Sequence, residues 1–169
     1  MKWTTKNLAL CAVLTALALG LSTLESLFPV SLVVPLPGVK LGLANIVTVF
    51  ALYQLGAGAA LAILLTRCLL GGLFAGNLSA MLFSVLGGLT AMLVMIFLRR
   101  LPKLSVYGVS IGGAAAHNIG QMAAAVITLG STMVLGYLPF LLAVSLFTGA
   151  LTGFITALLL RATRHIRFH

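Results

Sequence analysis

Long apolar runs, separated by short polar, glycine-rich or proline-rich segments, make up most of the chain. A helix that crosses the hydrocarbon core of a bilayer needs roughly 20 mostly apolar residues, and the runs are about 15 to 24 residues long. We therefore predict an all-α integral membrane protein, a bundle of about six transmembrane helices that forms one transmembrane domain over residues 1–169. The predicted spans are 8–24, 41–55, 59–75, 78–98, 106–129 and 137–160.

Basic residues at the ends of these runs indicate how the bundle is oriented. They fall in three groups, before the first run, between the fourth and fifth runs, and after the last run. With six spans all three groups lie on one side, and loops rich in Lys and Arg stay in the cytoplasm. We predict that both termini are cytoplasmic, and that the first run is a retained helix rather than a cleaved signal peptide, because cleavage would destroy this parity. The three groups are Lys2 and Lys6; Arg99, Arg100 and Lys103; and Arg161, Arg164 and Arg167.

The composition agrees with a bilayer environment and removes several classes of function. Hydrophobic residues make up 62%, charged residues 7%, and the mean hydropathy is +1.24. The net charge of +9 is explained by the flanking basic residues, so we expect the lipid bilayer and no nucleic acid as a partner. Cys11 and Cys68 lie inside apolar runs and are interpreted as packing residues. We expect no metal site and no cofactor in this chain.

Missing motifs argue against catalysis. The sequence has no Walker-type glycine loop and no nucleophile motif, which excludes ATP hydrolysis by this chain alone. Prenyl-diphosphate chain elongation needs aspartate clusters that hold magnesium, and the sequence contains one acidic side chain. The chain is therefore not a stand-alone prenyl synthase.

Two segments have unusual features. Residues 28–38 contain three prolines among apolar residues, so this stretch cannot continue as a helix, and we predict an outer lid that packs on the protein. The second span, 41–55, reaches only roughly 22 Å and needs support from its neighbours. Small residues four positions apart, such as Gly149 and Gly153, predict close packing between helices.

Polar side chains inside the apolar runs are the best candidates for function, because their insertion into lipid is costly. Asn45 shares a face of the second span with Thr48, and a second polar stripe lies on the fifth span, so two facing stripes predict a cavity. A purely structural role stays open for each of them. Arg67 could pair with Glu25, Lys40 could extend to the membrane interface, His117 could be a hydrogen-bonded core histidine, and Asn118 and Gln121 could join helices. The candidate ligand-binding residues are Lys40, Asn45, Arg67, His117, Asn118 and Gln121, with Glu25 as the structural ionic partner of one of the cations.

Residues 36–53 and 108–121 carry a family resemblance. Together with Glu25, residues 67–71 and residues 137–139, they resemble a bacterial membrane family labelled Gx transporter or heptaprenyl diphosphate synthase component I. By fold-level analogy this family is similar to the S components of energy-coupling-factor vitamin transporters, which are six-helix proteins with a lid-like first loop. Ala12 and Ala16 match the spacing through which S components contact their transmembrane coupling partner.

The resemblance implies a substrate-binding subunit of a small-molecule or vitamin-type transporter in the bacterial cytoplasmic (inner) membrane. A separate transmembrane coupling subunit and ATPase subunits would energise it. Two cations and little acid favour an anionic or polar ligand, such as a vitamin, a flavin or a prenyl derivative. The alternative is a non-catalytic membrane subunit of an isoprenoid-linked or quinone-linked complex, and a third possibility is an uncoupled channel or facilitator.

Overall fold

The structure, a computed structural model, describes residues 5–27 and 42–165 of the chain. Over these two ranges the chain forms six α-helices and one short 3-10 helix, with no strand. The predicted all-α bundle is thereby confirmed. The elements are α1 (Thr5–Leu27), α2 (Asn45–Gln54), α3 (Ala57–Ala75), α4 (Leu78–Arg99), α5 (Val106–Leu129), η2 (Thr132–Tyr137) and α6 (Leu138–Ala162).

The helices differ in their capacity to cross a bilayer. Four segments are long and apolar enough, namely α1, α3, α4 and the continuous segment of η2 and α6. With 24 residues α5 is long enough, but it is not among these four segments, and it carries the polar residues His117, Asn118 and Gln121. The described part of α2 has 10 residues, which at 1.5 Å per residue covers about 15 Å, or half of the hydrocarbon core. The second helix is therefore shorter than the predicted span 41–55.

Local signals in the sequence explain where several helices begin and end. The side chain of Asn77 caps α4 by accepting a hydrogen bond from the backbone N–H of Ala80 at 3.0 Å. Ser105 caps α5 in the same way. Gly76 and Gly130 end α3 and α5 in the left-handed conformation that glycine adopts readily, with φ of 58° and 62°. Gly76 and Asn77 thus lie in the turn between α3 and α4, Ser105 precedes α5, and Gly130 separates α5 from η2.

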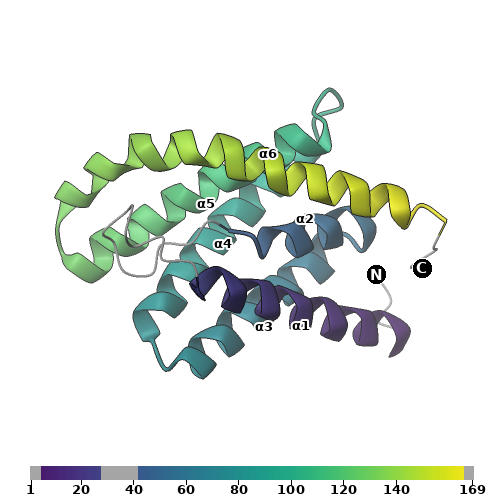
Figure 1. The fold of residues 1–169 in the computed structure, drawn as a ribbon, viewed down its shortest axis with the longest axis horizontal. Helices are drawn as coiled ribbons and strands as arrows, with labels where there is room; N and C mark the ends of the chain where they lie inside the picture. The colour runs from purple at the N-terminus through teal and green to yellow at the C-terminus, as the bar shows by residue number, and fades with distance from the viewer. Residues whose placement is uncertain (1–4, 28–41, 166–169) are drawn as a thin grey trace.

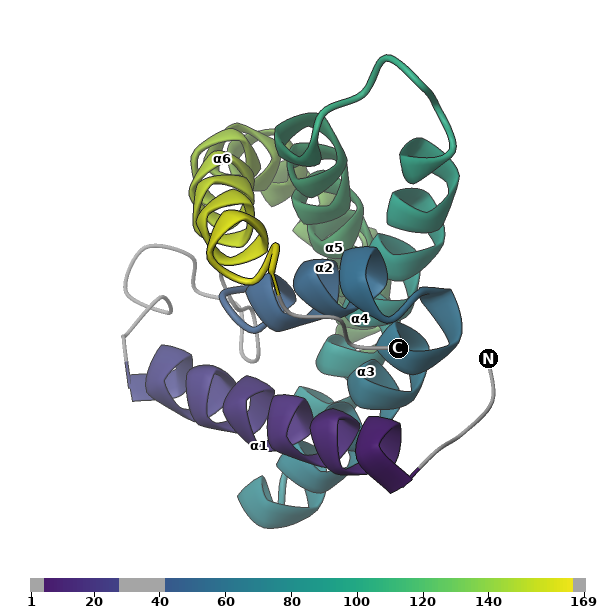
Figure 2. The same cartoon turned by 90° about the vertical axis from the view of Figure 1, so that its right-hand side faces the viewer.

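The short helix α2 lies in the middle of the molecule. Figures 1 and 2 both place it between α6 and α1, and it also contacts α3 and α4. It begins near the centre of the molecule in Figure 1 and runs toward the end at which α1 starts and α6 finishes. Most of its residues are buried, from Asn45 to Leu52. The N-terminus of α2 is therefore enclosed by protein.

The far end of α2 is held by a cation from α4. Arg99 donates a hydrogen bond from Nη1 to the backbone oxygen of Leu52, and its guanidinium carbon lies 5.0 Å from the centroid of the Tyr53 ring. A cation at a helix C-terminus is electrostatically favourable. Gln54 adds a hydrogen bond of 3.0 Å to the Thr163 hydroxyl beyond α6. These contacts fix α2 along its axis.

Glycines allow the closest approaches between helices. A Cβ atom on Gly149 of α6 would lie 2.6 Å from the Cα of Ile111, and one on Gly153 would lie 3.0 Å from a backbone atom of α5. The predicted packing role of this pair is confirmed. Gly76, by contrast, has no atom within 4 Å of a Cβ position and acts as the end of α3.

Candidate functional site

Five of the polar residues singled out in the sequence meet around the N-terminus of α2. They come from four helices, and each is at most 6% exposed. We call this group the polar cluster. Its members are Glu25 from α1, Asn45 from α2, Arg67 from α3, and His117 and Gln121 from α5.

Arg67 brings a positive charge into the cluster from the middle of α3. Its Nη2 donates a hydrogen bond to Oδ1 of Asn45 at 3.4 Å, which is longer than the 2.7–3.2 Å of an ordinary N–H···O bond. Its Nε is buried and has no hydrogen-bond partner among the residues that the structure describes. The guanidinium therefore retains a donor for a further acceptor.

Glu25 joins the end of α1 to the start of α2. Its carboxylate accepts a hydrogen bond from the backbone N–H of Gly42, three residues before α2 begins. A carboxylate is stabilised near a helix N-terminus, where it faces the positive end of the helix dipole. Its predicted role as ionic partner of a cation stays a prediction.

His117 and Gln121 lie one turn apart on α5 and contact each other. Nε2 of Gln121 lies 3.1 Å from Nε2 of His117. Which of the two groups donates depends on the tautomer of His117 and the orientation of the Gln121 amide, so the contact fixes the proximity of the two side chains. Oε1 of Gln121 is buried without a hydrogen-bond partner among the described residues.

Two glycines flank the imidazole of His117. A Cβ atom on Gly42 would lie 3.7 Å from Cδ2 of the ring and 2.9 Å from Nδ2 of Asn45. On the other side of the ring, a Cβ atom on Gly87 of α4 would lie 2.9 Å from its Cε1. Gly42 therefore lies beside both His117 and Asn45, and the predicted cavity between the two polar stripes stays a prediction.

Asn118 points to a different neighbour. Its Nδ2 donates a hydrogen bond of 2.7 Å to the backbone oxygen of Leu141 on α6. This contact places it at the interface of α5 and α6, in the helix-joining role considered for it from the sequence. Lys40 and the predicted lid, residues 28–38, lie outside the described residues.

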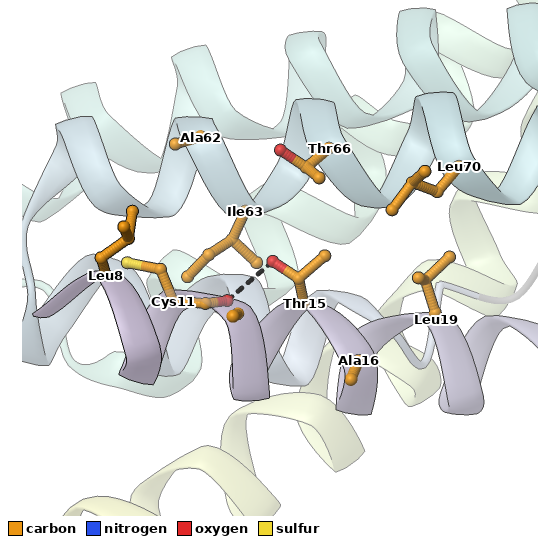
Figure 3. Close-up of a pocket in the computed structure, with 10 residues that line it drawn as sticks. Leu8, Cys11, Thr15, Ala16, Leu19, Ala62, Ile63, Thr66 and Leu70 are labelled. Atoms are coloured by element: carbon orange, nitrogen blue, oxygen red, sulfur yellow. Dashed lines mark hydrogen bonds between the residues drawn. The ribbon is translucent and has the colours of Figure 1, made fainter. Parts of the chain in front are cut away.

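Ala12 and Ala16, predicted to contact a partner, lie along a groove between α1 and α3. The groove has a volume of about 450 Å³, and Figure 3 shows the side chains of the two helices that line it. Its lining is apolar apart from Thr15 and Thr66. The Thr15 hydroxyl donates a hydrogen bond of 2.7 Å to the backbone oxygen of Cys11, marked by the dashed line in Figure 3.

Gly42, Gly87 and Arg99 shape the site, and sequence reasoning missed these roles. The sequence displays glycines at many helical positions, and nothing in their spacing distinguishes those that contact His117. The sequence indicates for Arg99 only the role of an orienting charge on the cytoplasmic side. The short length of the second span was the one signal that α2 needs an anchor.

The polar cluster offers chemistry suited to binding. It combines a guanidinium, two amides, an imidazole and the Glu25 carboxylate, and all of these except the carboxylate can donate hydrogen bonds to an oxygen-rich ligand. In the described ranges, no group of three or more His, Cys, Asp and Glu residues is placed to hold a metal ion. The cluster therefore gathers polar groups from four helices in a buried position, and its use as a ligand site stays a prediction.

Comparison with known proteins places the chain in a family. The family profile described as heptaprenyl diphosphate synthase component I matches residues 14–159, which is most of the chain. The chain belongs to this family. No curated protein and no solved structure gives a significant match.

Proposed function

We propose that this member of the heptaprenyl diphosphate synthase component I family is a non-catalytic membrane subunit that binds the anionic head group of a prenyl compound at the polar cluster. The observation that carries the proposal is Arg67, a buried guanidinium whose Nε has no hydrogen-bond partner among the described residues. A mid-span arginine costs about 2.5–3.5 kcal/mol to insert. A ligand that this charge holds would offset that penalty.

The position of Arg67 supports an anionic ligand. Its guanidinium contacts Asn45, the first residue of α2, and therefore lies at the positive end of that helix dipole. A cation is disfavoured at a helix N-terminus, whereas an anion is favoured. The carboxylate of Glu25, which accepts a hydrogen bond from the backbone N–H of Gly42, offsets part of this positive potential. An oxyanion at Nε of Arg67 would neutralise the rest and gain the bonding geometry that arginine offers to phosphate and carboxylate.

The family description supports a prenyl compound as the ligand. The term component I implies a second component, and one acidic side chain cannot build the magnesium site of a prenyl synthase. The catalytic chain would therefore be a separate protein, and this chain would hold the product or substrate with its hydrocarbon part in the bundle or the lipid. We place the protein in the bacterial cytoplasmic membrane with both termini in the cytoplasm.

Transport of a small molecule is the second candidate function, and the half-length helix α2 favours it. Broken or short helices whose N-termini point at a buried anionic group are typical substrate sites in membrane transporters. The same polar cluster would then bind a vitamin-like or flavin-like anion. A transmembrane coupling subunit would dock at Ala12 and Ala16, and ATPase subunits would drive release.

Native mass spectrometry of the protein, purified gently from its own membrane, tests both candidates. A retained prenyl phosphate together with a prenyl synthase chain is the expected result. A retained vitamin or flavin with ATPase subunits would replace the proposal by the transport function. A neutral ligand, or an anion retained equally by Arg67→Gln, would refute anion binding at the polar cluster. Arg100→Gln, which removes an exposed charge outside the bundle, is the matched control.

A further inference from the structure

We infer that Gly87 is a positioning residue, which sets the place of the His117 imidazole and thereby the fit of the ligand. The inference rests on the proposed function, because it assumes that the polar cluster binds the ligand. Gly87 is buried on α4, and its Cα faces α5. A Cβ atom there would lie 2.9 Å from Cε1 of His117, 3.0 Å from its Nδ1 and 3.0 Å from Cγ of Gln121.

The imidazole has little room to move away from a methyl group at position 87. Gly42 lies beside the opposite edge of the ring, and Nε2 is bonded to Gln121. The backbones of α4 and α5 cannot separate freely either. The Thr90 hydroxyl lies 3.0 Å from the backbone oxygen of Ala116 across the helix interface, and it shares its one proton between this oxygen and those of Leu86 and Gly87 in its own helix.

A second glycine supports this close crossing from the other helix. A Cβ atom on Gly120 would lie 2.1 Å from Oγ1 of Thr90 and 2.8 Å from the Cα of Gly87. Packed interiors respond to even one added methylene, because few voids exist to take it up. Gly87→Ala therefore shifts the ring toward Gly42 and Asn45, the space that the ligand would share.

Gly88 provides a matched control in the same helix. It is also buried, but a Cβ atom there would meet Cδ1 of Leu64 at 2.7 Å, the end of a flexible side chain on α3. Gly88→Ala therefore adds the same methyl group at a buried position of the same helix without contact to His117. A difference between the two variants isolates the effect on the ring from a general loss of packing.

The experiment first measures the NMR signal of the His117 ring and then the affinity of the protein for a prenyl diphosphate. The protein is labelled with ¹³C-histidine in micelles, and the His117 Cε1–H signal is assigned by its loss in His117→Gln. We expect Gly87→Ala to move this signal and Gly88→Ala to leave it in place.

The binding measurement uses farnesyl diphosphate as the probe. We expect its Kd to rise about tenfold in Gly87→Ala, equivalent to about 1.4 kcal/mol, and by less than about twofold in Gly88→Ala. Gly87→Ala should add little further loss in the His117→Gln background, since two of its three closest contacts are with the His117 ring.

The other possible results distinguish the positioning role of Gly87 from the identity of the ligand. An unmoved His117 signal in Gly87→Ala, or equal shifts in the two glycine variants, overturns the inference. A moved signal without farnesyl diphosphate binding to any form upholds the positioning of the ring and refutes the proposed prenyl ligand. If Gly87→Ala does not fold, Gly87→Ala with His117→Asn should fold, because the smaller side chain leaves room for the methyl group. Failure of that pair also overturns the inference.

Discussion

Replacing Arg67 by glutamine should separate ligand binding from stability. Among the residues that the structure describes, Arg67 makes one side-chain hydrogen bond, 3.4 Å long, to Asn45. A hydrogen bond of ordinary length to a charged group contributes about 1.5–3 kcal/mol to stability, so this longer one contributes less than about 3 kcal/mol. Inserting the charge at mid-span costs about 2.5–3.5 kcal/mol. Arg67→Gln should therefore be at least as stable as the wild-type protein.

Ligand affinity should change in the opposite direction. A hydrogen bond to a charged group contributes about 1.5–3 kcal/mol, and each 1.4 kcal/mol changes Kd about tenfold. We therefore expect Arg67→Gln to bind farnesyl diphosphate about 10-fold to 100-fold more weakly. Arg67→Lys keeps the charge but loses the planar pair of donors, so its affinity should lie between those of the wild type and the glutamine variant.

Two assays on the same preparations measure these effects. Equilibrium unfolding in mixed micelles, followed by circular dichroism, gives the free energy of unfolding without ligand. Titration calorimetry gives Kd, with Arg100→Gln as the control for nonspecific charge effects. A variant Arg67→Gln that is clearly less stable than the wild type and binds farnesyl diphosphate equally well would show that Arg67 is a structural residue and would refute the reasoning.

Three further predictions concern the frame around the site. Asn118→Ala should reduce the free energy of unfolding by about 1 kcal/mol, because it removes the hydrogen bond to Leu141, and should leave Kd unchanged in calorimetry. Asn77→Ala should lower stability by about 1 kcal/mol through loss of the α4 cap, seen by circular dichroism, and equal stability would contradict the assignment of the cap. Gly149→Ala should cost about 1–3 kcal/mol because its methyl group would meet the backbone of Ile111, and an unchanged unfolding curve would refute that close contact.

The sequence predicts the helices well because bilayer thickness sets their length. The range 106–129 agrees with α5 at both ends, since Ser105 caps it and Gly130 stops it. The second helix was predicted too long, because apolar residues continue on both sides of α2. Apolar composition shows that residues avoid water, but it does not show where a helix breaks inside the protein.

The polar cluster was predictable in its members but not in its geometry. Asn45, Arg67, His117 and Gln121 are costly in lipid, so their convergence follows from the need for polar partners. The direction of Asn118 toward α6 could not be deduced, because its place on α5 fits either face. The role of Gly87 could not be predicted from the sequence, because it depends on the atoms of α5 that face this glycine and not on the residues next to it in the chain.

The central claim is that the polar cluster binds an anionic head group, and a comparison of two probes tests it most directly. Farnesyl diphosphate and farnesol share a hydrocarbon chain and differ in charge. Titration of the wild-type protein should show the diphosphate binding at least about tenfold more tightly, with inorganic pyrophosphate competing, as expected for a charge-assisted contact with Arg67. Equal affinity for the two probes would contradict the account.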